Sequence, residues 1–314
     1  MNQAEEKRGK FTVAKVLQYI CIGLLAFINY FLVSLVLIPF LGDSVVVQNV
    51  VPAVVVGCVI ALAFTPAIDS FFVLLKRLKP FERIEEHEKR QYSDIDEKYH
   101  SFLAMLQETC NEQNINMPKV YIAHSDFPHA FFVTDRVFAV TLNFINGLTL
   151  DEQKAAVLHE MYHVKNRDVQ LLSVADAANV FGGIVTWILT AVLSFLGLSG
   201  RINAISASAS GDTDSAHTGI ALLIVAWMFR GLLALINWFV HVLTLGISRS
   251  GDYSADEFVA DAGYKDALVS YLQKMSSLDP KQFEGYAVEM WKRQVAPKAR
   301  INHIMAYSPK ALLA

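Results

Sequence analysis

Two histidines and a glutamate stand close together in residues 157–168, which read VLHEMYHVKNRD. His159 and His163 are four residues apart, so on a helix both imidazoles lie on one face and can hold one zinc ion. Glu160 lies about 100° further round the helix, where it can take a proton from the attacking water and pass it to the leaving amine. A chance match to this pattern has a probability of about one in a hundred at this composition. The motif therefore predicts metal-assisted hydrolysis of a peptide bond, against the alternative of two histidines on a helix surface.

The segment before the motif predicts that it does lie on a helix. Thr149 and Glu152 form a T-x-x-E capping box, which satisfies free backbone donors in the first turn. Ala155 and Ala156 favour helix, and Asn166 is a plausible end.

A catalytic zinc needs a third protein ligand and one open position. Acidic residues in a predicted helix near the C-terminus supply the candidates, which are Asp252, Asp256, Glu257 and Asp261. Asp252 and Glu257 cannot both serve, because at 100° per residue they point about 140° apart.

The rest of the chain is unusually apolar, with 54% hydrophobic residues. Apolar residues gather in four blocks, at 16–41, 50–75, 171–198 and 220–247. Each block exceeds the roughly 20 residues that a helix needs to cross a bilayer. Four buried helices of a soluble core fit less well, because soluble helices are rarely apolar on every face. Arg230, in the fourth block, is expected to face the helix bundle or a polar cavity, either in a structural pairing with Asp176 or Asn179 or in a substrate role.

Basic residues on the flanks predict the orientation of these spans. Four lie before the first block and three directly after the second: Lys7, Arg8, Lys10, Lys15, Lys76, Arg77 and Lys79. The link 42–49 has none, and the link 199–217 has one. The positive-inside rule then places both termini, segment 76–170 and the tail in the cytoplasm, with the chain in the cell (inner or plasma) membrane.

Net charge and cysteine content narrow the possible partners and the cellular compartment. A net charge of −3 without a basic run speaks against a nucleic-acid partner. Cys110 stands alone in the polar segment while Cys21 and Cys58 lie in spans, so we expect no disulfide and a reducing compartment.

The polar segment 76–170 has the length of a small domain. Tyr99, Phe102, Leu103, Leu106 and Cys110 recur at helical spacing and predict an amphipathic helix. Runs at 119–125, 129–134 and 136–145 predict a small sheet. The expected organisation is 1–75 with spans one and two, 76–170 as the catalytic segment, 171–247 with spans three and four, and 248–314 as a helical tail packed on the catalytic segment.

The order of these pieces resembles the HtpX-like membrane zinc metallopeptidases, relatives of the CAAX-prenyl proteases. Two spans are followed by MPKVYIAHSDFPHAFFV, LTLDEQKAAVLHEMYHVKNRD, two further spans and ISRSGDYSADEFVADAGY. The resemblance implies a mainly α integral membrane protein whose four transmembrane helices join an α+β zincin-type cytoplasmic catalytic domain with a small β-sheet.

The resemblance also assigns roles to residues. It makes His159 and His163 zinc ligands and Glu160 the catalytic base, and it selects Asp252 over Glu257 as third ligand by the spacing from Ser248-Arg249. Asp256 would orient a zinc histidine. Asp168 would support the site from behind the ligands, and Arg249 matches the arginine of the family's S-R dipeptide.

Three positions depart from the family pattern. Asp252 replaces a glutamate, which is one methylene longer. His129-Ala130-Phe131 replaces N-A-F on the expected substrate strand, where His124 and His129 are expected to be solvated or substrate-facing. The histidine that the family carries before Arg300-Ile301 is missing.

We therefore predict a membrane-embedded, cytoplasmic zinc endopeptidase with one Zn²⁺ per chain. Its expected partners are the lipid bilayer and polypeptide substrates. The resemblance implies that these substrates are misfolded or damaged membrane proteins. The strand with residues 129–134 would pair with an extended substrate. The alternatives are a prenyl-protein protease and a catalytically inactive membrane scaffold.

Overall fold

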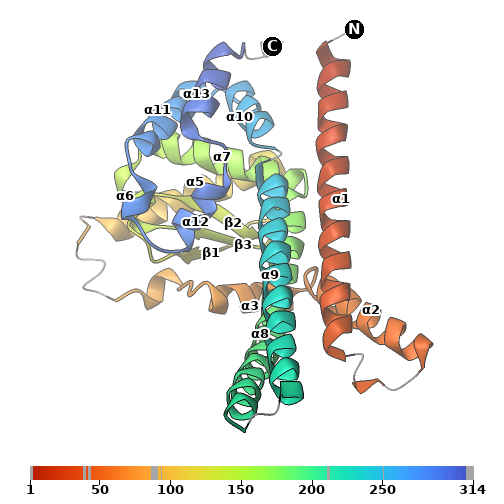
Figure 1. Cartoon of the computed structure of the whole chain (residues 1–314). Helices are drawn as coiled ribbons and strands as arrows, with labels where there is room; N and C mark the ends of the chain where they lie inside the picture. Colours follow the sequence, from red (N-terminus) through yellow and green to blue (C-terminus); the bar gives the residue numbers. More distant parts are fainter. Residues whose placement is uncertain are drawn as a thin grey trace. The chain divides into compact units, whose positions relative to one another are not determined.

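The computed structural model describes residues 3–37, 40–41, 44–85, 91–92, 94–210, 213–249 and 251–308. The chain is mainly helical and carries one three-stranded sheet (Figure 1), which confirms the predicted fold class. It divides into two compact units. One unit comprises Met1–Gln18, Leu62–Ser173 and Gly246–Ala314, and the other comprises Tyr19–Ala61 and Val174–Leu245.

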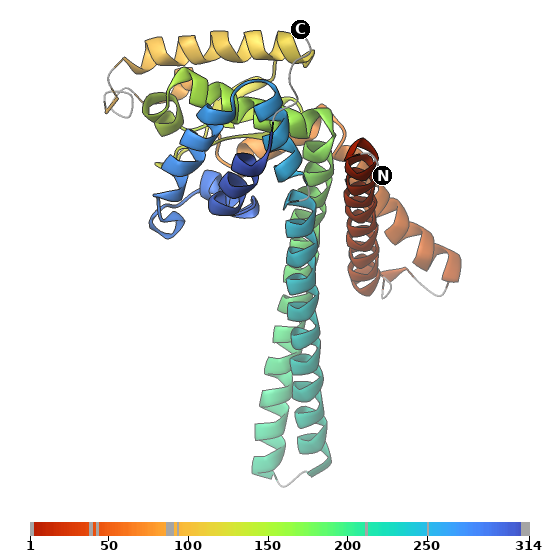
Figure 2. The same ribbon diagram turned by 90° about the horizontal axis from the view of Figure 1, so that it is seen from above.

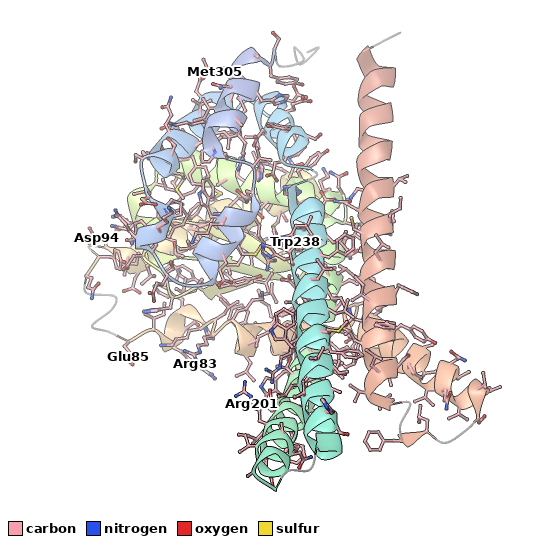
Figure 3. The ribbon with its side chains drawn as sticks, viewed as in Figure 1. Arg83, Glu85, Asp94, Arg201, Trp238 and Met305 are labelled. Carbon is pink, nitrogen blue, oxygen red and sulfur yellow. The ribbon has the colours of Figure 1, made fainter. Side chains whose placement is uncertain are left out.

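Within the described part of the chain, four helices are long and apolar enough to cross a membrane, as the hydropathy of the sequence predicts. They are α1 (Gln3–Leu37), α2 (Val45–Leu62), α8 (Asp168–Ser210) and α9 (Thr213–Arg249). Large apolar side chains along them are exposed, Trp238 of α9 among them (Figure 3). Exposure of this kind suits contact with lipid.

The second predicted span, 50–75, is wrong in one respect. α2 ends at Leu62, and a separate helix α3 begins at Pro66 and runs to Leu75. Pro66 stands in the first turn of α3, where its missing N–H costs nothing, whereas inside a continuous helix it would remove a hydrogen bond and clash with the preceding turn. The apolar run therefore forms two helices.

α8 and α9 run side by side as a long hairpin (Figures 1 and 2). The predicted link 199–217 is mostly helical, because α8 continues to Ser210 and α9 already starts at Thr213. Small residues allow the close approach: a Cβ on Gly219 would lie 2.6 Å from the carbonyl oxygen of Gly200. Arg230 donates to Ser194 Oγ at 2.7 Å, so its predicted pairing with Asp176 or Asn179 is wrong.

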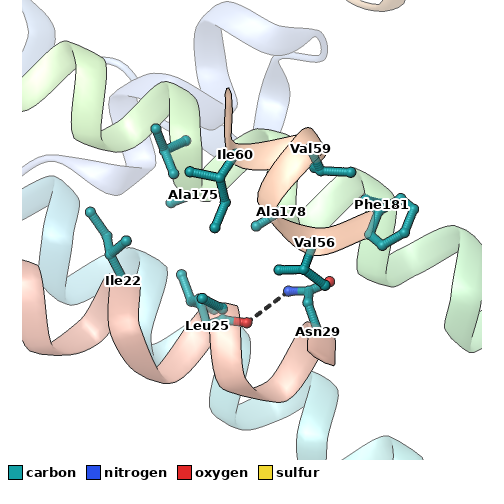
Figure 4. Close-up of a pocket in the computed structure, with 11 residues that line it drawn as sticks. Ile22, Leu25, Asn29, Val56, Val59, Ile60, Ala175, Ala178 and Phe181 are labelled. Atoms are coloured by element: carbon teal, nitrogen blue, oxygen red, sulfur yellow. Dashed lines mark hydrogen bonds between the residues drawn. The ribbon is translucent and has the colours of Figure 1, made fainter. Parts of the chain in front are cut away.

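α1, α2 and α8 pack around one buried polar side chain, Asn29 (Figure 4). Its Nδ2 donates to the carbonyl oxygen of Leu25 at 2.8 Å, one turn earlier in α1. A Cβ on Gly182 would lie 2.8 Å from Asn29 Oδ1, so the glycine permits this contact between α1 and α8.

The sheet of the other unit has the order β1-β3-β2. β1 (Lys119–Ile122) is parallel to β3 (Val137–Val140), and β2 (Ala130–Thr134) is antiparallel to it. The predicted strand 136–145 is too long. It stops at Val140 because Thr141 caps α6 (Leu142–Gly147), its side chain accepting a hydrogen bond from the Phe144 amide.

Helices cover both sides of this sheet, with α7 (Leu150–Lys165) on one side and α3 on the other (Figure 1). α5 (Ile95–Gln113) buries Tyr99, Phe102, Leu106 and Cys110, as its spacing predicts. The tail forms α10 (Asp252–Asp261), α11 (Lys265–Ser276), α12 (Tyr286–Arg293) and α13 (Pro297–Ala306). Short 3-10 turns lie at Phe81–Arg83 and Pro280–Gln282. Side chains of the sheet, α5, α7 and the tail share one hydrophobic core.

Candidate metal centre

α7 carries the two histidines and the glutamate of the motif on a helix that begins as predicted. The Thr149 side chain accepts from the Glu152 amide, and the Glu152 carboxylate accepts from the Thr149 amide. Glu152 also accepts from Ser270 and Lys274 of α11, which joins the start of α7 to the tail. Further along α7, His159, Glu160 and His163 are buried.

α10 brings Asp252 beside these histidines. One ligand atom each from His159, His163 and Asp252 lies within 4.8 Å of the others. Asp252 is the first residue of α10 and its Oδ1 lies 3.6 Å from His163 Nε2. Gly251 makes the approach possible, since a Cβ there would lie 2.9 Å from Asp168 Oδ2 and 3.0 Å from His163 Cε1.

Carboxylates behind the histidines fix the orientation of both rings. His163 Nδ1 lies 2.9 Å from Asp168 Oδ2, and His159 Nδ1 lies 2.9 Å from Asp256 Oδ1. A proton shared at Nδ1 leaves Nε2 as the nitrogen that can bind a metal. Asp168 also accepts from Lys15 of α1, a residue that the sequence indicates only as part of a basic flank.

Arg300 of α13 completes the support for His159. Its Nε and Nη2 donate to Asp256 at 2.9 and 2.6 Å, and both side chains are almost wholly buried. Although burial alone would raise the pKa of Asp256, the charge of Arg300 and the hydrogen bond with His159 hold it well below its usual range. Asp256 is therefore a permanent anion next to His159.

Gln294 links Arg300 to the catalytic candidate Glu160. Its Oε1 accepts from Arg300 Nη1 at 2.9 Å, and its Nε2 donates to Glu160 Oε1 at 3.1 Å. Burial raises the pKa of Glu160 to about 7. A carboxyl group that titrates near neutrality can both accept and return a proton. No local pattern around Gln294 signals this role, because its partner on α7 lies 134 residues away in the chain.

The residues fit a divalent cation. Glu160, Asp168, Asp252 and Asp256 bring four carboxylates, while Arg300 and Lys15 bring two cations. With all four ionised, this cluster keeps two negative charges, which one divalent ion would neutralise. Two imidazoles and a carboxylate are a donor set typical of catalytic zinc.

A cavity adjoins two of the three candidate ligands, His163 and Asp252. It is lined by Phe132, Glu160, His163, Asp168, Val169, Leu172, Asp252, Met290 and Gln294. Its volume of about 40 Å³ accommodates water-sized molecules. The open position that a catalytic zinc requires therefore has room next to Glu160.

The other acidic candidates of α10 face away from this cluster. Glu257 Oε1 lies 3.0 Å from His303 Nε2, and Asp261 accepts from the Tyr307 hydroxyl at 2.9 Å. Arg249 ends α9, and its side chain lies outside the described part of the structure.

The predicted substrate strand lies next to the site but is not open to solvent. His124 is exposed, but His129 precedes β2 and is buried, with its Nδ1 3.2 Å from the Tyr271 hydroxyl, so a solvated His129 is wrong. Burial, together with the nearby charge of Arg300, lowers the pKa of His129 to about 3. Ala130 and Phe131 are buried within β2.

One edge of β2 nevertheless points toward Glu160. The carbonyl of His129 accepts from the Thr141 amide on the side of β3, so by alternation Ala130 and Phe132 turn their peptide groups to the opposite edge. The Phe132 amide makes a hydrogen bond with Glu160. α12 covers this region, with Tyr286 against Phe131 and Trp291 against His129 at ring distances of 5.4 Å each.

Comparisons with known proteins agree with this geometry. The sequence profile of peptidase family M48 matches residues 98–307, well over half of the chain. A protease HtpX homologue of Desulforapulum autotrophicum is 31% identical over 188 residues, which cover 58% of this chain and 55% of that protein. One of Syntrophobacter fumaroxidans is 32% identical over 177 residues, covering 55% and 57%. One of Bacteroides fragilis is 24% identical over 238 residues, covering 74% and 66%.

The chain spans about half the length of several of the relatives that it matches. No solved structure matches it. The family profile covers nearly all of α5 and the chain from there through α13, and so includes the whole cluster on α7, α10 and α13. The chain therefore belongs to peptidase family M48 as an HtpX-like member.

Proposed function

We propose that this chain is a membrane-embedded zinc endopeptidase. The observation that carries the proposal is the buried cluster of His159, His163 and Asp252 beside Glu160. Membership of a peptidase family supports it, as do four helices able to cross a membrane. The catalytic parts are segments 76–170 and 248–314, and the spans lie in 1–75 and 171–247.

Zinc binding, orientation of the ligands and proton transfer are assigned to different residues of the site. His159, His163 and Asp252 would hold one zinc ion, with Asp256 and Asp168 keeping each Nδ1 protonated so that each Nε2 faces the metal. When bound, zinc supplies Lewis-acid chemistry that polarises the peptide carbonyl and acidifies water. Glu160 takes a proton from the attacking water at its carboxylate and returns it to the leaving amine. Gln294 and the Phe132 amide hold that carboxylate in place.

The substrates are polypeptides, and the edge of β2 away from β3 offers them main-chain hydrogen bonds. Because α12 covers His129 and Phe131, an extended segment reaches this edge only when α12 moves aside. Binding through main-chain hydrogen bonds is only loosely selective for the substrate sequence. Such selectivity in a membrane protein suits the removal of misfolded or damaged membrane proteins. The active site and both termini are cytoplasmic, as the distribution of basic residues predicts.

Activity of the detergent-purified protein tests the proposal. The wild type should contain one zinc and cleave casein, and Glu160→Gln should keep the zinc while losing cleavage, since it removes the base and no ligand. An inactive scaffold would cleave nothing with zinc bound. Cleavage confined to prenylated peptides would favour the prenyl-protein protease, and a Glu160→Gln variant as active as the wild type would exclude this mechanism.

Cysteine labelling in intact cells tests the orientation. Cys110 is wholly buried, so an exposed neighbour on α5 such as Gln107 is the better site. A cysteine at position 107 should resist an impermeant reagent, whereas one within 43–48 or 200–216 should react. Labelling of position 107 from outside would reverse the topology.

A further inference from the structure

α3 presents two different faces along its ten residues. Ile68 and Phe72 are buried against the rest of the unit that holds the metal site. Phe71, Leu74 and Leu75 are exposed, and Leu74 shows 79% of its surface. Phe64, in the link before α3, is also more than half exposed. We call Phe71, Leu74 and Leu75 the apolar row of α3. Apolar side chains this exposed are unusual on the water-facing surface of a protein.

Hydrogen bonds fix α3 rigidly to the sheet beside the metal site. Asp69 accepts from Thr134 Oγ1 and from Arg136 Nε, both at 2.7 Å. After the helix, Lys79 and Ile122 exchange two backbone hydrogen bonds of 3.0 and 2.7 Å. The hydrogen bonds of Asp69 thus point to the sheet, whereas Phe71, Leu74 and Leu75 lie on the exposed side of α3.

The chain on either side of α3 indicates what covers the apolar row. Only three residues, 63–65, separate α3 from the end of α2, which is long and apolar enough to cross a membrane. Three basic residues follow at once, Lys76, Arg77 and Lys79. Arg77 has a φ of 53°, and its left-handed conformation ends the helix with the Leu78 amide bonded to the Val73 carbonyl at 2.9 Å.

We propose that α3 lies in the interface of the lipid bilayer, with Phe71, Leu74 and Leu75 among the acyl chains and the exposed Arg77 and Lys79 at the phosphates. An amphipathic helix in this position buries its apolar face at the boundary between headgroups and acyl chains, and cations beside it attract anionic lipids. This inference rests on the membrane location of α2, which is part of the proposed function.

An α3 helix in the bilayer interface would hold the catalytic unit at a fixed distance from the membrane surface. β2 packs on α3 and lines the cavity beside Glu160. With α3 held in the interface, the edge of β2 away from β3 stays next to the bilayer surface. The peptide bonds that reach it most readily are then those just outside a transmembrane segment of the substrate.

Depth measurements on the full chain test the inference. Cys21, Cys58 and Cys110 are replaced by alanine, and a single cysteine carrying an environment-sensitive fluorophore is placed at Leu74, Val54 or Gln107. Val54 is an exposed residue of α2 and Gln107 an exposed residue of α5, so they serve as lipid and water controls. Reconstituted in bilayers, position 74 should resemble position 54, with blue-shifted emission quenched by nitroxide lipids and protected from iodide.

The outcomes separate this inference from the proposed function. Water-like behaviour at position 74 with a lipid-like position 54 overturns the interfacial helix alone. Water-like behaviour at both overturns the membrane location of α2 as well. Protection of position 74 from both quenchers means that protein covers the row, for example a second copy, and also contradicts the inference.

A second measurement does not depend on the cysteine-free background. Phe71→Ser combined with Leu74→Ser leaves Asp69, β2 and the metal site untouched. Cleavage of a substrate anchored by its own transmembrane helix should fall relative to cleavage of soluble casein, while bound zinc stays the same. An equal effect on both substrates would contradict a role of α3 in setting the height of the site.

Discussion

Replacing Asp256 by asparagine is expected to weaken zinc binding and the folded state together. Asp256 is wholly buried, holds His159 Nδ1 at 2.9 Å and accepts two hydrogen bonds from Arg300. Asparagine keeps the shape but loses the charge that offsets the buried guanidinium. Loss of one partner of a buried ion pair costs about 3–5 kcal/mol. Loss of the group that orients a metal-binding histidine costs about 10- to 100-fold in metal affinity.

Two assays separate these effects. Thermal unfolding of the metal-free protein in detergent reports the loss of the ion pair, and competition with a zinc chelator reports the affinity. Glu257→Gln is the matched control, since Glu257 lies on the same helix but pairs with the half-exposed His303. A pair that is partly open to solvent in this way contributes on the order of 1 kcal/mol. If Asp256→Asn binds zinc as tightly as the control, the proposed support of His159 is refuted.

How much of the fold and of the metal centre could be predicted from the sequence depends on how far apart the interacting residues lie in the chain. The start of α7 and the placement of His159, Glu160 and His163 on one helix follow from residues within four positions of one another, and the structure confirms the helix. The apolar run 50–75 was expected to be continuous, because hydropathy does not register that Pro66 opens a new helix.

The links between segments could not be predicted from local patterns. Gln294 and Arg300 reach α7 and α10 from a tail that the sequence predicts only to be helical. Lys15 reaches Asp168 across 153 positions of the chain. Asp252 was selected only by its spacing in a known family, and no local pattern signals that Gly251 before it leaves room for the Asp168 and His163 side chains.

Three further predictions concern single residues. Gln294→Ala should lower kcat/KM for casein by about tenfold, the worth of one hydrogen bond to a charged group, with bound zinc unchanged; an unchanged rate would show that Glu160 needs no such support. Gly251→Ala should weaken zinc binding in chelator competition, because its Cβ would collide with Asp168 and His163; wild-type affinity would contradict the packing of α10. Burial tends to raise the pKa of Glu152, but hydrogen bonds from Lys274, Ser270 and Thr149 hold it below its usual value. The stability that ionised Glu152 gives the folded state is therefore present above its unfolded pKa of about 4.3, and it is lost as the pH falls through the lower pKa of the folded state. Glu152→Gln should lower stability by about 1–3 kcal/mol at pH 7 and by less under acid, and a loss independent of pH would contradict the ionic contact.

Elemental analysis of two purified variants tests the metal centre most directly. One carboxylate oxygen of Asp252 lies within 4.8 Å of one ring nitrogen each of His159 and His163, whereas Glu257, the alternative third ligand, pairs with His303. Asp252→Ala should lose its zinc, and Glu257→Ala should retain one zinc per chain. Zinc retained by Asp252→Ala and lost from Glu257→Ala would contradict the assignment of the third ligand and the centre built on it.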